Sequence, residues 1–91
     1  MALWVPVITP NGVMWVEADS LDRWERSVAA SHVNHVTNAL GSGDFDRLRD
    51  YEGTSLGGLP LATDPETIED LDDRGDLDFD QFYWDPRRDR R

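Results

Sequence analysis

Residues 4–16 read Trp-Val-Pro-Val-Ile-Thr-Pro-Asn-Gly-Val-Met-Trp-Val, and they predict a β-hairpin. Two runs rich in β-branched and aromatic side chains, which favour strands, flank the tetrapeptide of residues 9–12. Pro10 presets φ for the second position of a turn, Asn11 suits the third position, and Gly12 accepts a positive φ. Pro6 lacks a backbone N–H group, so we expect the first strand to lie at the margin of its sheet.

A long helix is expected next, over residues 21–40. Asp19 or Ser20 offers an N-cap, because a short side chain there can accept a hydrogen bond from a backbone N–H of the first turn. The helix dipole favours acids in the first turns, and the sequence provides Asp22 and Glu25. Gly41 and Gly43 supply the stop.

The inner face of this helix is predicted from its periodicity. Apolar and small residues recur at intervals of three and four, as an amphipathic helix requires. They are Leu21, Trp24, Val28, Ala29 or His32, Val36, Ala39 and Leu40. We expect Trp24 and Val28 to pack on the hairpin.

Shorter elements are expected in the second half of the chain. Residues 44–51 suffice for two helical turns with one apolar side, made by Phe45, Leu48 and Tyr51. Residues 54–62 surround two consecutive glycines and form either a second tight hairpin or an irregular loop.

A last helix is expected from Thr63, which has the capping-box spacing to Glu66, while Pro65 sits where its missing donor is harmless. Ile68 and Leu71 face inward, and Gly75 ends the helix.

The predicted fold class is therefore α+β. An N-terminal β-hairpin packs on one long helix, followed by short helices and a short second hairpin or loop. Ninety-one residues suit one core, so we expect a single compact domain over residues 1–85 and a disordered, Arg-rich tail over residues 86–91. Without cysteine, stability must come from packing rather than from disulfides.

The chain carries 19 Asp plus Glu residues against nine basic residues, all of them Arg, for a net charge of −10. This charge repels nucleic acid phosphates and anionic membranes, so no direct nucleic acid or membrane partner is expected. The N-terminus lacks a basic segment, and Pro6 and Pro10 interrupt its apolar run, which argues against a secretory signal or a membrane span. We expect a protein of the host-cell cytoplasm.

Catalytic and metal patterns are weak. His32 and His35 lie three apart on the long helix, but the pattern lacks a third metal ligand. Asp76, Asp78 and Asp80 suggest a calcium loop, yet Gln81 occupies the position that requires glycine. No serine lies in a nucleophile elbow and no phosphate-binding loop is present. We therefore expect no cofactor, no metal and no enzymatic activity.

The segment of residues 64–85 holds most of the excess charge, with ten acids and a single base, Arg74. Two structures compete for residues 76–84. In a strand, Asp76, Asp78 and Asp80 would project at intervals of about 6.6 Å, twice the phosphate spacing of about 3.4 Å in one DNA strand. In a helical turn, aromatic side chains would share a face instead, namely Phe79, Phe82 and Tyr83. The helical turn is favoured.

This C-terminal segment is the candidate partner-binding site. Its residues are Asp76, Asp78, Phe79, Asp80, Phe82, Tyr83 and Trp84. Four aromatic residues within six positions offer more anchoring surface than a terminal segment usually needs. The competing interpretation is that the acids are only a solvated surface and the aromatic residues are core.

One pattern runs through the C-terminal half, with Gly53, Leu56, Gly58, Leu61, Thr63-Asp64-Pro65, Ile68-Glu69, Leu71 and then Gly75-Asp76-Leu77-Asp78-Phe79. It resembles small uncharacterised acidic proteins of actinobacteria and their phages. The resemblance implies a shared fold, since these are mainly turn, cap and core residues. It also implies a role that such phage proteins often have, the inhibition of host enzymes that include defence nucleases.

The expected function is that of a small acidic accessory protein of a phage or mobile element. It would bind and inhibit a basic protein that handles nucleic acid, such as a nuclease or polymerase, by DNA mimicry, as anti-CRISPR or anti-restriction inhibitors do. The alternative is a structural or assembly protein of a phage particle, in which the hairpin edge joins a neighbour's sheet. A homodimer is compatible with either role.

Overall fold

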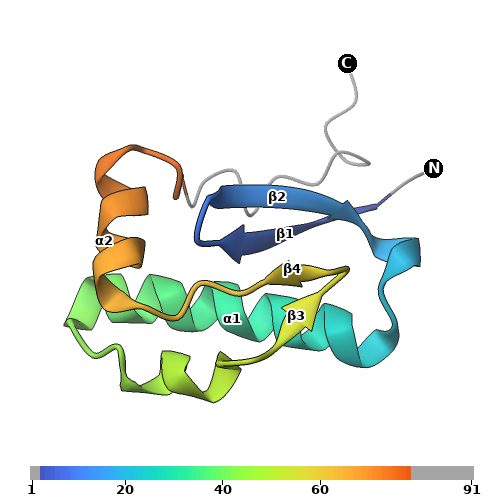
Figure 1. The fold of residues 1–91 in the computed structure, drawn as a ribbon, viewed down its shortest axis with the longest axis horizontal. Helices are drawn as coiled ribbons and strands as arrows, with labels where there is room; N and C mark the ends of the chain where they lie inside the picture. Colours follow the sequence, from blue (N-terminus) through green and yellow to red (C-terminus); the bar gives the residue numbers. More distant parts are fainter. Residues whose placement is uncertain (1–2, 79–91) are drawn as a thin grey trace.

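The computed structural model describes residues 3–78 and has the predicted α+β architecture (Figure 1). In chain order, its elements are β1 (Trp4–Thr9), β2 (Gly12–Glu17), the 3₁₀ turn η1 (Ala18–Ser20), α1 (Arg23–Ser42), the 3₁₀ helix η2 (Asp46–Tyr51), β3 (Ser55–Leu56), β4 (Leu59–Pro60) and α2 (Pro65–Asp73). The β1–β2 hairpin lies over the small β3–β4 hairpin, which lies over α1, and α2 closes the end at which α1 finishes.

The structure confirms the predicted N-terminal β-hairpin. β1 and β2 pair antiparallel from Trp4 opposite Glu17 to Thr9 opposite Gly12. The hydroxyl of Thr9 donates to the Gly12 carbonyl at 2.8 Å and accepts from the backbone N–H of Asn11 at 3.2 Å, and Gly12 has a φ of 126°. This sheet has two strands, so β1, with its proline, lies at a margin as expected.

The α1 helix starts later than predicted. Its N-cap is Asp22, whose carboxylate accepts from the backbone N–H of Glu25 at 2.7 Å, while the Glu25 carboxylate accepts from the Asp22 N–H at 3.1 Å. Asp19 and Ser20 are therefore not the cap. They lie in η1, because the chain makes a separate turn there before it enters the helix. Gly43 ends α1 with a φ of 79°, whereas Gly41 lies inside the helix, which therefore ends later than predicted.

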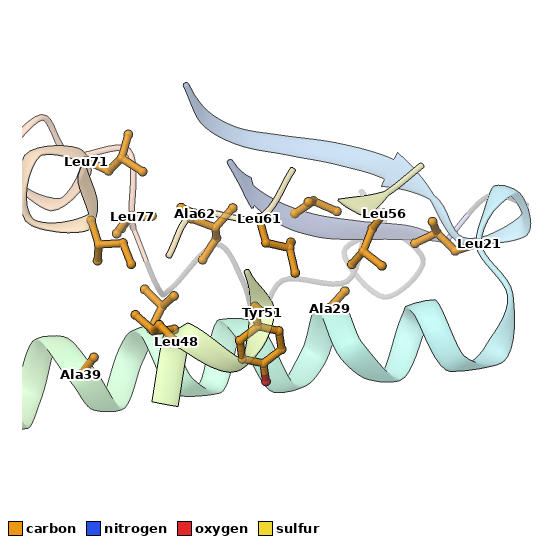
Figure 2. Close-up of a cluster of buried hydrophobic side chains, with 14 residues drawn as sticks. Leu21, Ala29, Ala39, Leu48, Tyr51, Leu56, Leu61, Ala62, Leu71 and Leu77 are labelled. Atoms are coloured by element: carbon orange, nitrogen blue, oxygen red, sulfur yellow. The ribbon is translucent and has the colours of Figure 1, made fainter. Parts of the chain in front are cut away.

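The expectation for Trp24 is wrong, because its side chain is 63% exposed. The buried face of α1 consists of Ala29, His32, Val36 and Ala39. One turn before Ala29, the buried face of the helix continues at position 25. Trp24 precedes this position by one residue and points about 100° away from it, so its side chain is turned away from the core. Val28 is only partly buried against the core, and Leu21 covers the end of the core from outside the helix (Figure 2).

The second half follows its prediction more closely. Leu48 and Tyr51 of η2 are buried, and residues 54–62 form the tight hairpin rather than the irregular loop. The N-cap of α2 is Asp64, not Thr63, because its carboxylate accepts from the backbone N–H of Thr67 at 3.3 Å and from the Thr67 hydroxyl at 3.0 Å.

Buried apolar side chains from every part of the described chain form one cluster between α1 and the hairpins (Figure 2). Those without solvent exposure are Ile8, Val36, Leu48, Leu56, Ala62, Ile68 and Leu71. Within residues 3–78, no helix is long and apolar enough to cross a membrane. The expected tail of residues 86–91 lies outside the described residues.

Replacing Leu48 by alanine should lower the free energy of unfolding by about 2–5 kcal/mol, because the fully buried side chain leaves a cavity. Met14→Ala is the control. Its side chain is 49% exposed, and the change should stay within about 0.5 kcal/mol. Urea unfolding of both variants measures the difference, and equal losses would contradict the assignment of the core.

Candidate acidic binding surface

The largest concentration of charge lies on α2 and on the residues that flank it. Every Asp and Glu of residues 64–78 is exposed, and we call this set the acidic surface: Asp64, Glu66, Glu69, Asp70, Asp72, Asp73, Asp76 and Asp78. The rest of the described chain also carries eight acids, but it has four arginines to balance them, whereas residues 64–78 have one. The net charge is therefore most negative at the end of the molecule that α2 occupies.

Two buried side chains orient the acids of α2. Ile68 and Leu71, three apart on one side of the helix, have no solvent exposure. The other sides carry five carboxylates, on Glu66, Glu69, Asp70, Asp72 and Asp73. From Glu66 to Asp73, seven rises of about 1.5 Å span about 10.5 Å, so successive charges lie on average about 2.6 Å apart along the helix axis. Duplex DNA carries one charge about every 1.7 Å, so the linear charge density of α2 is about two-thirds of that of DNA.

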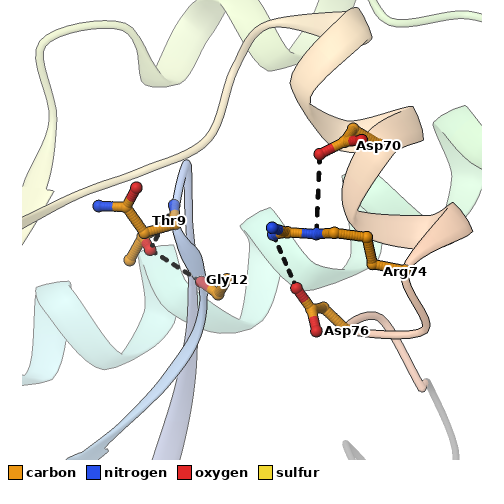
Figure 3. Close-up of polar contacts among 6 residues, drawn as sticks. Thr9, Gly12, Asp70, Arg74 and Asp76 are labelled. Carbon is orange, nitrogen blue, oxygen red and sulfur yellow. Dashed lines mark hydrogen bonds and ion pairs between the residues drawn. The ribbon is translucent and has the colours of Figure 1, made fainter.

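Arg74 is the single base of this surface and is shared by two carboxylates (Figure 3). Its Nε lies 3.7 Å from an Asp70 oxygen, and its Nη2 lies 2.8 Å from an Asp76 oxygen. Both pairs are at least partly exposed, so each contributes little stability. The other acids of the surface greatly outnumber this one cation.

Asp76 also faces the tip of the β1–β2 hairpin (Figure 3). A Cβ atom placed on Gly12 would lie 3.5 Å from an Asp76 carboxylate oxygen. The carboxylate therefore sits between Arg74 and the hairpin turn. Among the residues predicted to bind a partner, Asp76 thus has an intramolecular partner, Arg74, close to the hairpin tip.

The predicted binding residues are only partly covered by the described chain. Asp76 and Asp78 are exposed on either side of Leu77, which is 4% exposed, and residues 76–78 lie in neither helix nor strand. Phe79, Asp80, Phe82, Tyr83 and Trp84 lie outside the described residues, as does most of the segment for which strand and helical turn compete. Their role stays a prediction.

The carboxylates of α2 were missed as site residues, although the sequence carried a signal for them. Glu66, Glu69, Asp70 and Asp73 follow a spacing of three and four, opposite Ile68 and Leu71. That spacing places acids on the solvent side of a helix. The later Asp-x-Asp-x-Asp pattern was selected as the candidate site instead.

The end of α2 carries charge that its own helix disfavours. The C-terminus of a helix has a partial negative charge, so cations are stabilising there and acids are not. The last turn nevertheless contains Asp72 and Asp73 and no base, and the one cation near it is Arg74 at the C-cap. Helix stability does not explain these two acids.

The two histidines of α1 are engaged in hydrogen bonds (Figure 2 shows Tyr51 between α1 and the core). The Nε2 of His32, which is buried, lies 2.7 Å from the carbonyl oxygen of Ala62, and the Nδ1 of His35 lies 2.7 Å from the Tyr51 hydroxyl. The rings of His32 and Tyr51 meet edge to face at 4.9 Å. Among residues 3–78, no group of three or more potential metal ligands occurs.

Burial changes the proton affinity of two of these groups. Burial lowers the pKa of His32 below its ordinary value, against the effect of the hydrogen bond to the Ala62 carbonyl, which raises it. His32 is therefore neutral at pH 7 and donates its Nε2–H to Ala62. Burial also raises the pKa of Tyr51, although a hydrogen bond with Ser31 opposes the shift. Both groups are thus held neutral and contribute to packing between α1 and η2.

No protein-family model, curated protein or solved structure matches this chain.

The double change Asp72→Asn and Asp73→Asn should raise the free energy of unfolding by about 0.5–1 kcal/mol, because it removes two acids from the negative end of α2. Glu66→Gln is the matched control. It removes an acid from the first turn, where the dipole favours one, and should lower stability by a few tenths of a kcal/mol. Chemical denaturation at low salt measures both, and changes of the same sign would contradict the dipole argument.

Stability should fall as the pH drops from 7.5 to 5.5. Unfolded His32 gains a proton near pH 6.5, whereas the folded protein resists protonation because the pKa of His32 is lowered, so acid favours unfolding. His32→Gln retains an N–H donor for Ala62 but cannot titrate, and it should flatten this dependence. The urea midpoint at several pH values measures the effect. An unchanged slope in the variant would assign the effect to other groups.

Proposed function

We propose that this chain is an accessory protein of a phage or mobile element that binds and inhibits a basic, nucleic-acid-handling protein. The acidic surface is the binding face, and the chain acts by occupancy rather than by catalysis. The observation that carries the proposal is the set of five exposed carboxylates on α2, whose density along the helix axis is about two-thirds of that of the phosphates along duplex DNA.

Two features support a binding role over a merely solvated surface. Solubility requires net charge but no particular location, whereas here the excess gathers at one end of the molecule. Asp72 and Asp73 also occupy the helix end at which acids lower stability. A surface that keeps charge where the fold disfavours it is typical of a functional site, because binding residues are commonly selected against the interest of stability.

The proposed mechanism is competition with nucleic acid. A cleft lined by Arg and Lys attracts the acidic surface from a distance, and α2 then lies where a DNA backbone would lie. Charges of this kind set mainly the association rate and the salt dependence. Slow dissociation requires buried anchors, and the aromatic residues Phe79, Phe82, Tyr83 and Trp84 directly follow the acidic surface in the sequence.

A role in assembly is the second candidate, in which the N-terminal hairpin would pair with a strand of a neighbouring chain. Such a protein would polymerise or join a particle, and its acidic surface would remain outside the contact.

Capture from host lysate with the immobilised chain tests the proposal. The captured protein should be basic and nucleic-acid-binding, and duplex DNA should displace it. The Asp72→Asn, Asp73→Asn variant should bind at least about tenfold more weakly, although it is the more stable protein, because each rim charge contributes to attraction.

Asp19→Asn with Asp50→Asn is the matched control, since it removes the same charge from exposed positions outside the acidic surface. It should bind nearly as the unchanged chain does. Equal weakening by both double variants would show that the interaction depends on net charge alone and not on the acidic surface. Recovery with particles or as polymers, without a DNA-displaceable partner, would support the assembly role instead.

A further inference from the structure

The outer face of α1 differs from the remaining surface because it carries no formal charge for most of its length. From Ser27 to Ser42 the helix contains no Asp, Glu or Arg, in a chain of which 31% is charged. Its exposed residues there are small or amide-bearing, among them Ser27, Ser31, Asn34 and Asn38. A chain with a net charge of −10 can approach a copy of itself most easily through such a face.

A large aromatic side chain lies at one end of this face. Trp24 is 63% exposed, the most of any large apolar residue in the described chain. At 100° per residue, Trp24, Ser31, Asn38 and Ser42 fall within about 40° of one another around the helix, so they share one side. An exposed tryptophan on an uncharged helix face is typical of the centre of a protein interface.

A hollow lies at the other end of the same face. Its lining residues come from α1 and from the start of the next segment: Asn34, His35, Asn38, Ser42, Asp44 and Arg47. Arg47 takes part in neither ion pair found among the described residues. Its guanidinium can therefore receive the face of an aromatic ring, an arrangement that favours tryptophan over other side chains.

The positions of Trp24 and the hollow fit a two-fold arrangement. The hollow is centred near position 38 of α1, and the midpoint between positions 24 and 38 is Ser31. When two copies of α1 lie antiparallel and cross at Ser31, each Trp24 faces the hollow of the other copy. Ser31 has a small side chain, which suits the crossing point, and its hydroxyl also interacts with Tyr51 of η2 at the edge of this face.

We propose that the chain forms a symmetric homodimer through the outer face of α1, with Trp24 of each copy inserted into the hollow of its partner. The contact is self-complementary, as a closed two-fold interface requires. It places an aromatic ring beside a guanidinium. The acidic surface stays outside it, because α2 lies on the side of α1 that faces the hairpins (Figure 1), and antiparallel helices keep the two copies of α2 apart.

Sedimentation equilibrium of the full chain over a range of concentrations tests this proposal without any other partner. The unchanged chain should dimerise, and Trp24→Ser should raise the dimer Kd at least about 30-fold, as loss of a tryptophan hot spot does. Trp4→Ser is the control, since Trp4 is 41% exposed but belongs to β1 rather than to α1, and the Kd of this variant should stay within about threefold of that of the unchanged chain. A monomeric unchanged chain, or a dimer indifferent to Trp24→Ser, would overturn the proposal.

Single cysteines test the register, because the chain has no cysteine of its own. Ser31→Cys lies on the two-fold axis and should form an intermolecular disulfide readily under mild oxidation. In the matched variant Ser27→Cys, the two thiols would lie about 12 Å apart along the helices, beyond the reach of a disulfide. Cross-linking of Ser27→Cys as fast as Ser31→Cys would exclude this arrangement, whatever the oligomeric state.

Discussion

The two backbone groups of Ala62 hold the layers of this protein together. Its N–H donates to the carbonyl of Ile8 in β1 at 2.9 Å, and its carbonyl accepts from the imidazole of His32 in α1 at 2.7 Å. All three residues are buried, so water cannot replace either bond once it is broken, and an unpaired group there would be costly. This single residue fixes how far the hairpin lies from the helix and where the chain leaves toward α2.

Local patterns predicted most elements and few of the contacts between them. The Pro-Asn-Gly turn, the period of α1 and the inward pair Ile68 and Leu71 are encoded within a few neighbouring residues. The cap of α1 was misplaced because Asp19, Ser20 and Asp22 satisfy the same rule, and only the intervening η1 turn selects Asp22. Trp24 was predicted to be buried because its spacing fits one face of the helix, whereas the small residues of α1 pack against the core through another face. The bond between His32 and Ala62 joins distant residues, and no local pattern specifies it.

The sequence predicted the negative charge of the candidate site, but it predicted the position of that site only in part. Composition located the excess of acid in residues 64–85, but it did not reveal that Asp76 forms an ion pair with Arg74 near the hairpin tip. The helix of residues 65–73 instead offers the continuous exposed row. The carboxylates of α2 and the uncharged outer face of α1 lie on different sides of α1, with Trp24 at the N-terminal end of that face. Two different contacts can therefore operate on one small domain without interfering.

The same Ala62 bonds also constrain the order of folding. The hairpin and α1 contain mainly near-neighbour contacts, which form quickly, whereas residue 62 must close long loops to reach residues 8 and 32. The segment that includes α2 is then expected to dock last and to detach first, as a cooperative unit of lower stability than the rest. Because α2 docks through Ile68 and Leu71, which belong to the shared core, display of its carboxylates is coupled to completion of the fold.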